Sequence, residues 1–367
     1  MQSLGKRVLI VKQSSLGDVV HTLPVVHALK RCHPDWTIGW VVNQGFAPLV
    51  QRDPAVARIY PIRIPSTSDP SAGRGAWYRA FTATVRVLGR LRREFRAEPY
   101  DLVLDLHASL RSGLLVLMNP GGRRLGFADA RELNTLFQHQ LVANPAGRVH
   151  AVEKNLLFCE SLGCPSTPSD FHLCTAAADE ERVGEFLAAE GIGAAEPVVY
   201  VNPTARWSTK FWLVERWAEL ADRLLAAGIR PVFGGSDGDL AYIREITGRM
   251  HGRASVAAGA LSLTESAALM RRAAVYAGLD TGPMHMAAMI GTPVVALFGP
   301  THPERVGPYN VAHAIVRAEG LDCLCCRRRS CDHLSCMRGI ATETVYRQVM
   351  AFVGGGTPGE GRPWKSA

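Results

Sequence analysis

Short apolar runs recur along the chain and alternate with stretches whose apolar residues have helical spacing. The runs cover residues 7–11, 38–42 and 101–106 in the first half, and residues 197–203, 230–235, 275–280 and 293–300 in the second half. Continuous β-branched and apolar runs of this length are typical of strands buried on both faces of a parallel sheet. Strands that alternate with helices indicate right-handed βαβ units. The pattern therefore predicts an α/β protein built from doubly wound parallel sheets.

Two domains are predicted, because 367 residues exceed the size at which one hydrophobic core usually stops growing. A helical stretch flanked by Pro, Ser, Ala and Gly covers residues 167–197, and the strand after it begins a second series of βαβ units. We place an N-terminal domain over residues 1–170 and a C-terminal domain over residues 171–353. The Gly- and Pro-rich residues 354–367 are predicted to be a disordered tail.

The composition indicates the kind of partner and the cellular compartment. The formal net charge of +8 and the pI near 9.1 indicate an anionic partner, which could be a phosphorylated small molecule, an anionic lipid or a nucleic acid. No apolar run reaches the about eighteen residues of a membrane span, and the N-terminus does not read as a signal peptide. We therefore expect a cytoplasmic protein whose nine cysteines are thiols or metal ligands.

The first polar motif, VKQSSLGDVVHTLP, places Asp18 just after the first strand, where a helix that contains Pro24 in its first turns is predicted to begin. On spacing alone, the favoured interpretation is that Asp18 caps this helix. The alternative is a catalytic or ligand-facing carboxylate, because parallel sheets bind ligands at the carboxyl ends of their strands.

A second motif, LDTGPMHM, follows a strand that ends at Asp280. A short helix is predicted from about Met284, and its exposed N–H groups form a natural site for phosphate oxygens. Thr281, Gly282 and His285 would line this site. Taken alone, the motif would be better explained by a capped helix with a packed histidine.

Two further loops follow strands in the second half. The stretch NPTARWSTKFW carries hydroxyl groups and one cation, Lys210, whose position at a helix start calls for a neighbouring anion. The stretch GGSDGD offers carboxylates that could accept hydrogen bonds from ribose hydroxyls. No GxGxxG motif follows a predicted strand and no P-loop motif is present, which disfavours a dehydrogenase or a P-loop nucleotidase. The candidate donor-site residues in these loops are Thr204, Ser208, Thr209, Lys210, Asp237 and Asp239.

Together these segments resemble glycosyltransferase family 9, the lipopolysaccharide heptosyltransferases. The resemblance rests on KQSSLGDVVHTLP, NPTARWSTKFW, LDTGPMHMAAMIGTPVVALFGPT and the cysteine-rich CLCCRRRSCDHLSCM, which occur in the family's order. It implies a GT-B fold, with two Rossmann-like domains facing a central cleft and the donor held mainly by the C-terminal domain. It also implies inverting, metal-independent transfer from ADP-L-glycero-β-D-manno-heptose to the Kdo or heptose region of the lipopolysaccharide inner core. Whether the acceptor is that of the type I or the type II enzyme is left open.

The resemblance also assigns roles to residues. Asp18 would be the general base, with Ser15 and Gly17 on the acceptor side of the site. Lys210, Thr281, Gly282 and His285 would stabilise the departing ADP, and Asp280 would hold heptose hydroxyls. Some members have two adjacent threonines where this chain has Thr204 and Ala205, so the resemblance does not carry over one hydroxyl contact to the donor.

Arginines are concentrated in one segment, since residues 74–131 contain eleven arginines, no lysine and five acidic residues. A solvated helix surface explains part of this run. Because the family's acceptor carries Kdo carboxylates and lipid A phosphates, Arg111 and Arg131 are the expected acceptor contacts. The same surface could hold the protein on the anionic inner leaflet of the inner membrane.

The cysteine-rich segment has alternative interpretations. Cys323, Cys326, Cys331 and Cys336 could hold a structural zinc ion, with nearby arginines lowering their pKa values, or could be free thiols. The competing functions for the whole chain are a GT-B transferase with another nucleotide sugar and a non-catalytic basic module. No platform of interleaved basic and aromatic residues is visible, so we expect no nucleic-acid partner.

Overall fold

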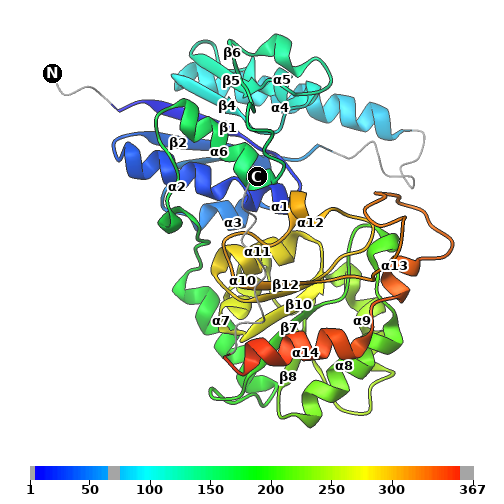
Figure 1. Ribbon diagram of the computed structural model, residues 1–367. Coiled ribbons are helices and arrows are strands. Elements are labelled where there is room, and N and C mark those ends of the chain that lie inside the picture. The colour runs from blue at the N-terminus through cyan, green and yellow to red at the C-terminus, as the bar shows by residue number, and fades with distance from the viewer. Residues whose placement is uncertain (1–4, 65–74, 356–367) are drawn as a thin grey trace. The chain divides into compact units, whose positions relative to one another are not determined.

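The computed structural model describes residues 5–64 and 75–355, which divide into two compact units, one ending at Phe171 and the other beginning at His172 (Figure 1). The tail predicted to be disordered lies outside the described residues from residue 356 onward. Among the described helices, none is both long enough and apolar enough to cross a membrane.

The first unit contains a six-stranded, wholly parallel sheet with the order β3-β2-β1-β4-β5-β6. Its strands are β1 (Arg7–Val11), β2 (Thr37–Asn43), β3 (Arg58–Ile62), β4 (Leu102–Asp105), β5 (Arg123–Phe127) and β6 (Gln140–Val142). This order reverses direction between β1 and β4, and ligands bind at such a switch point in doubly wound sheets.

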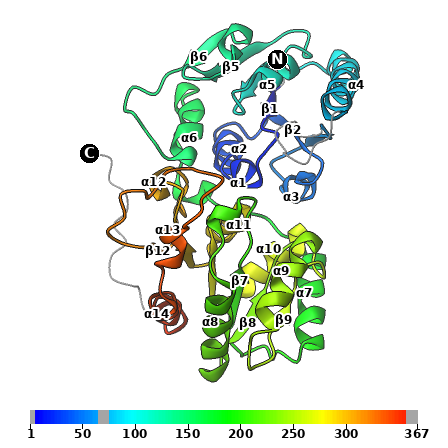
Figure 2. The same cartoon turned by 90° about the vertical axis from the view of Figure 1, so that its right-hand side faces the viewer.

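Helices cover both faces of this sheet (Figure 2). They are α1 (Leu16–Val20), α2 (Leu23–Cys32), α3 (Ala47–Gln51), α4 (Ala76–Ala97), α5 (Leu110–Val116) and α6 (Ala151–Ser161), with short 3-10 helices η1 (Asn134–Phe137) and η2 (Pro168–Asp170). Leu91 and Phe95 of α4 pack on Leu9 and Val103 of the sheet in one core cluster. On the other face, α2 packs against α6.

The second unit repeats the topology with the order β12-β11-β10-β7-β8-β9. Its strands are β7 (Val198–Asn202), β8 (Arg230–Phe233), β9 (Ser255–Val256), β10 (Val275–Leu279), β11 (Val294–Leu297) and β12 (His313–Val316). Its helices are α7 (Ala177–Ala189), α8 (Val214–Ala226), α9 (Leu240–Thr247), α10 (Leu263–Arg272), α11 (Gly282–Ile290), α12 (Pro303–Val306), α13 (Ser335–Arg338) and α14 (Thr342–Val353), with η3 (Ser208–Lys210) and η4 (Asp237–Asp239). Trp217 of α8 and Val349 of α14 belong to one core cluster with the sheet.

The predicted α/β architecture is confirmed, with two local corrections. The single helix expected after the first strand is two helices, α1 and α2, because Pro24 occupies the first turn of α2 and cannot continue a helix from α1. The helix expected from about Met284 begins at Gly282. Both differences lie at helix starts, where local capping decides the boundary.

Candidate functional site

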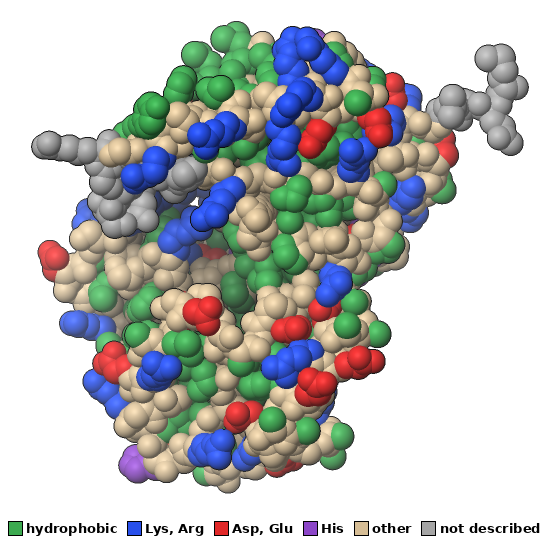
Figure 3. All heavy atoms as spheres, turned by 180° about the vertical axis from the view of Figure 1, so that it is seen from behind, with side chains coloured by type: hydrophobic (Ala, Val, Ile, Leu, Met, Phe, Trp, Pro, Cys, Tyr) green, Lys and Arg blue, Asp and Glu red, His purple; other side chains and the backbone are tan. Residues whose placement is uncertain are grey.

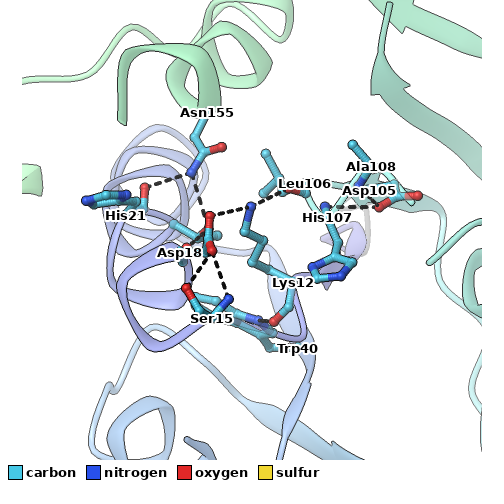
Figure 4. Close-up of polar contacts among 11 residues, drawn as sticks. Lys12, Ser15, Asp18, His21, Trp40, Asp105, Leu106, His107, Ala108 and Asn155 are labelled. Carbon is cyan, nitrogen blue, oxygen red and sulfur yellow. Dashed lines mark hydrogen bonds and ion pairs between the residues drawn. The ribbon is translucent and has the colours of Figure 1, made fainter. Parts of the chain in front are cut away.

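Asp18 lies in the first turn of α1, just beyond the carboxyl end of β1 (Figure 4). One carboxylate oxygen, Oδ2, accepts hydrogen bonds from the backbone N–H and the hydroxyl of Ser15, each at 2.8 Å. Asp18 therefore does cap the helix, as its spacing favoured. The cap uses Oδ2 only, and the side chain keeps 42% of its surface exposed. A capping role thus leaves Oδ1 available to a substrate.

Lys12 supplies the charge beside Asp18. Its ammonium group lies 3.5 Å from Asp18 Oδ1 and donates a hydrogen bond to the carbonyl oxygen of Leu106, at 2.7 Å, while its side chain is only 10% exposed. Burial alone would raise the pKa of Asp18, but the Lys12 charge and the two Ser15 hydrogen bonds outweigh it and hold that pKa well below its ordinary value. Asp18 is therefore ionised at neutral pH.

The loop between β4 and α5 forms the other wall of this group. Asp105 is fully buried and accepts hydrogen bonds from the backbone N–H groups of His107 and Ala108, each at 3.1 Å, and from Asn134 Nδ2 at 2.7 Å. Burial raises the pKa of Asp105 despite these bonds. The buried carboxyl group fixes the loop, and with it the position of His107 beside Lys12 (Figure 4).

His107 is held neutral in this position. Burial, followed by the positive charge of Lys12, lowers the pKa of His107 to about 4, and Arg111 adds to the effect. Its Nδ1 atom has no hydrogen-bond partner among the described residues. A neutral imidazole with an unpartnered ring nitrogen, near an ionised carboxylate, can form a hydrogen bond with a polar group of a ligand.

Replacing His107 with Gln should flatten the pH dependence of stability between about pH 6.5 and pH 4. The unfolded imidazole takes up a proton below its ordinary pKa of 6.5, whereas the folded one does so only near 4. The unfolded state binds more protons in this window, so the free energy of unfolding falls as the pH falls. Gln cannot titrate, and the variant loses this contribution. Urea unfolding at several pH values measures how the free energy of unfolding changes with pH. Equal slopes in the wild type and the variant would contradict the lowered pKa of His107.

The predicted acceptor contacts have different surroundings. Ser15 and Gly17 belong to the start of α1, and Arg111 of α5 acts on the pKa of His107, so its charge lies near the Asp18 group. Arg131 is exposed in the turn before η1, where its carbonyl oxygen accepts a bond from the Asn134 N–H at 3.1 Å. No described contact joins the Arg131 guanidinium to Asp18 or its neighbours.

The second polar group lies at the carboxyl ends of β7 and β10. Lys210 Nζ donates to Asp280 Oδ2 and to the Asp280 carbonyl oxygen, both at 2.7 Å. The two side chains are 16% and 5% exposed. Asp280 is thus the neighbouring anion that the position of Lys210 called for, and the pair is largely shielded from water. His285 Nε2 lies 3.9 Å from the other oxygen of this carboxylate, Asp280 Oδ1.

Thr281 is the N-cap residue of α11, and Gly282 is the first residue of that helix. The Thr281 hydroxyl donates to Asn202 Oδ1 at 3.0 Å, and Asn202 Nδ2 donates to the Gly234 carbonyl oxygen at 3.3 Å. Asn202 therefore connects three strand-end loops. The N–H groups of the first turn of α11 point out of the helix with its positive dipole end, as the phosphate-site hypothesis requires.

The remaining donor-site candidates are less uniform. Thr204 is buried and Ser208 is exposed. Thr209 donates its hydroxyl to the carbonyl oxygen of Arg328, at 2.9 Å, which ties it to the cysteine-rich segment. Asp239 Oδ2 accepts bonds from the backbone and hydroxyl of Ser236, at 2.7 and 2.6 Å, in a capping arrangement like that of Asp18. Ribose contacts by Asp237 or Asp239 stay predictions.

All nine cysteines are free thiols, including those of the cysteine-rich segment. Among the described residues, no group of three or more His, Cys, Asp or Glu side chains is arranged to hold a metal ion. Zinc at Cys323, Cys326, Cys331 and Cys336 therefore gains no support here. The expectation of lowered thiol pKa values is wrong for Cys336, because burial and then the three other thiols raise its pKa.

Three residues that sequence reasoning did not single out complete these groups: Lys12, His107 and Asn202. Each ends or follows a buried strand beside a polar motif. A charged or amide side chain at the end of an otherwise apolar run could have indicated Lys12 and Asn202. Nothing in the spacing indicated His107.

Comparisons with known proteins cover most of the chain. A family model described as glycosyltransferase family 9 (heptosyltransferase) matches residues 88–336. Lipopolysaccharide heptosyltransferase 1 of Pseudomonas aeruginosa is 32% identical over 342 residues, which cover 89% of this chain and 88% of that protein. A family 9 glycosyl transferase structure from Veillonella parvula has a TM-score of 0.81 at 22% identity, covering 96% of this chain and 99% of that one. The structure of E. coli heptosyltransferase WaaC with ADP-2-deoxy-2-fluoro heptose has a TM-score of 0.68 at 26% identity, covering 94% and 99%.

Proposed function

The chain belongs to glycosyltransferase family 9, and on that premise we propose that it transfers heptose from ADP-L-glycero-β-D-manno-heptose to the Kdo or heptose region of the lipopolysaccharide inner core. It is a glycosyltransferase with two doubly wound parallel sheets, the GT-B fold. A relative's structure contains an ADP-heptose analogue, which supports the donor. The observation that carries the proposal is Asp18, an ionised and partly exposed carboxylate held rigidly at a sheet switch point.

Asp18 acts as the general base in this reaction. The acceptor hydroxyl oxygen attacks the anomeric carbon from the face opposite to the diphosphate, so the configuration inverts. As the new C–O bond forms, the hydroxyl proton moves to Asp18, and the bond between the anomeric carbon and the phosphate oxygen breaks with its electrons going to ADP. A carboxylate with a low pKa is a weak base, so proton transfer accompanies bond formation, when the hydroxyl has become acidic.

The second unit stabilises the departing ADP. The first turn of α11, with Thr281 and Gly282, offers N–H groups to phosphate oxygens, and Lys210 offers a positive charge. Asp280 orients the Lys210 ammonium and can accept hydrogen bonds from heptose hydroxyls through its remaining lone pairs. In the proposed reaction no metal ion is required, because these groups carry the compensating charge.

The acceptor proposed here is a lipid, so the reaction would take place in the cytoplasm at the inner face of the inner membrane. Arg111, whose charge reaches the Asp18 group, is the proposed contact for an acceptor carboxylate or phosphate. Arg131 stays a weaker candidate for the same role, since its described contacts are to η1.

The test is ADP release by the purified protein with ADP-heptose and either Kdo-lipid A or a mono-heptosylated acceptor. Both acceptors are also supplied in deacylated, water-soluble form. We expect saturable ADP release that depends on one of the two acceptors, which also decides between the type I and type II reactions. Release with a different nucleotide sugar and none with ADP-heptose would overturn the donor. Absence of release with every donor and acceptor, in a folded protein, would overturn the proposal.

A further inference from the structure

Large apolar side chains are exposed on one unit only. Ten described side chains of this kind are strongly exposed, and all precede residue 150: Trp77, Tyr78, Phe81, Val85, Leu110, Leu117, Leu133, Leu136, Leu141 and Val149. Residues 172–355 contribute none to this set. Exposed apolar side chains that gather in one region mark a surface that another molecule covers. Four of these ten side chains lie on α4.

The exposed side chains of α4 lie in its N-terminal half. Trp77 and Tyr78 are each 74% exposed, Phe81 is 67% exposed and Val85 is 51% exposed. Their spacing places them along one side of the helix. The side chains with which α4 packs on the sheet, such as Leu91 and Phe95, come from its C-terminal half. Figure 1 shows the N-terminal turns of α4 extending beyond the other elements of this unit. These apolar residues thus have no sheet to pack on.

Arginines flank this stripe. Arg79, Arg86, Arg92, Arg93 and Arg96 are exposed along α4, and none has an ion-pair partner among the described residues. Glu94 is the single acidic residue of the helix, and it is paired with Arg90 at 3.9 Å. Figure 3 shows apolar and basic side chains gathered side by side on the N-terminal unit. An exposed aromatic stripe with flanking arginines is the composition of helices that lie in the interface of an anionic bilayer.

We propose that the face of α4 formed by Trp77, Tyr78, Phe81 and Val85 is a membrane-docking surface that inserts into an anionic phospholipid bilayer. The aromatic rings enter the headgroup boundary, and the arginine side chains extend along it to lipid phosphates. The surface goes beyond the proposed reaction and does not depend on which sugar is transferred. It places the unit that holds Asp18 at a membrane.

A bilayer fits these residues better than the other possible occupants. A second copy of the chain would bring five unpaired arginines against five more, which repel one another. A nucleic acid would pair with the arginines and stack on the aromatic rings, but it offers no apolar phase for Val85 and Phe81. Only a bilayer supplies negative charge and an apolar layer at adjacent depths.

The test is co-sedimentation of the full-length protein with phospholipid vesicles. Vesicles of phosphatidylcholine alone are compared with vesicles that also contain phosphatidylglycerol. We expect binding to the anionic vesicles, and the Trp77→Ser/Phe81→Ser variant to bind them more weakly by roughly a factor of ten or more, since two large apolar side chains leave the interface. The Arg86→Ser/Arg93→Ser variant should weaken binding and reduce its salt dependence. Val149→Ser, which removes an exposed side chain that does not belong to α4, is the matched control.

Three outcomes would overturn the proposal. Equal vesicle binding by the wild type and the Trp77→Ser/Phe81→Ser variant would remove α4 from the contact. A change of oligomeric state in that variant would assign the face to a second copy, and loss of RNA or DNA binding would assign it to a nucleic acid. Turnover of the deacylated acceptor should be unchanged in the variant. A protein that binds vesicles through α4 but transfers no heptose would contradict the reaction and leave the docking surface standing.

Discussion

The Asp18→Asn variant should lose transferase activity by roughly 10²- to 10⁴-fold in kcat, the contribution typical of a general base. Asparagine has the same shape and can still accept the hydrogen bonds of Ser15, so the start of α1 is retained. It cannot take up the hydroxyl proton, and Lys12 loses its counter-charge. Because Asp18 belongs to the N-terminal unit and the proposed donor site to the C-terminal unit, the KM for ADP-heptose should change little.

The matched control for this variant is Asp170→Asn. Asp170 caps η2 with the same geometry, accepting a bond from the Thr167 N–H at 2.7 Å, and it also pairs with Arg31. Both substitutions remove a capping charge from the N-terminal unit and should lower stability, but only Asp18→Asn should lower kcat. Near wild-type kcat in a folded Asp18→Asn protein would remove Asp18 from catalysis.

Asp18 should also contribute to stability at neutral pH. Its folded-state pKa is depressed, so the stabilisation is present above the pKa of about 3.9 in the unfolded chain. It is lost as the pH falls further through the folded-state pKa. Activity loss in mild acid would therefore come from a group other than Asp18.

The second large effect is expected from Lys210→Met, which should lower kcat/KM for ADP-heptose by roughly 10²- to 10³-fold, the usual consequence of removing one group that stabilises a developing negative charge. Methionine keeps the apolar stem of the side chain and removes only the ammonium group. Titration with ADP should show weaker binding, because the lysine charge acts on the diphosphate in the ground state as well.

Lys210→Met should also lower the stability of the protein, and this loss must be distinguished from the loss of activity. The substitution leaves Asp280, whose side chain is 5% exposed, without its charged partner, and breaking such a buried pair costs about 3–5 kcal/mol. The Lys210→Met/Asp280→Asn protein removes both charges and should recover most of this stability without recovering activity. Lys154→Ala, which breaks an ion pair with Asp129 in the other unit, controls for loss of a lysine. Full activity in the double variant would mean that Lys210 serves the fold alone.

The α/β class of each unit and most of its buried strands could be predicted from the sequence alone. The runs that became β1, β2, β4, β7, β8, β10 and β11 are mainly apolar because these strands are buried on both faces, and that composition is local. The strands that were missed, β3, β5, β6, β9 and β12, are short or carry polar residues. Arg123 and Arg124 in β5, for example, can stay in a strand because half of its length lies near the surface.

Only part of the candidate site could be predicted from the sequence. Asp18 was predicted to cap the helix because capping is local, and it accepts the N–H of Ser15 three positions earlier in the chain. Lys12 and Leu106 are 94 residues apart, and Lys210 and Asp280 are 70 residues apart. Their contacts exist because β1 pairs with β4 and β7 pairs with β10, which brings the ends of distant strands together. The order of strands in a sheet depends on packing of the whole unit, which no local pattern contains.

The long helix α4 shows the same division. A solvated helix surface was expected for part of its arginine-rich run, and Arg92, Arg93 and Arg96 are exposed. The sequence could not tell which apolar residues of the helix would meet the sheet, because both halves carry them at helical spacing. In the tertiary structure Leu91 and Phe95 enter the core, while Trp77 and Phe81 stay exposed. The reason is that the sheet lies against the C-terminal half of the helix and does not reach the N-terminal half.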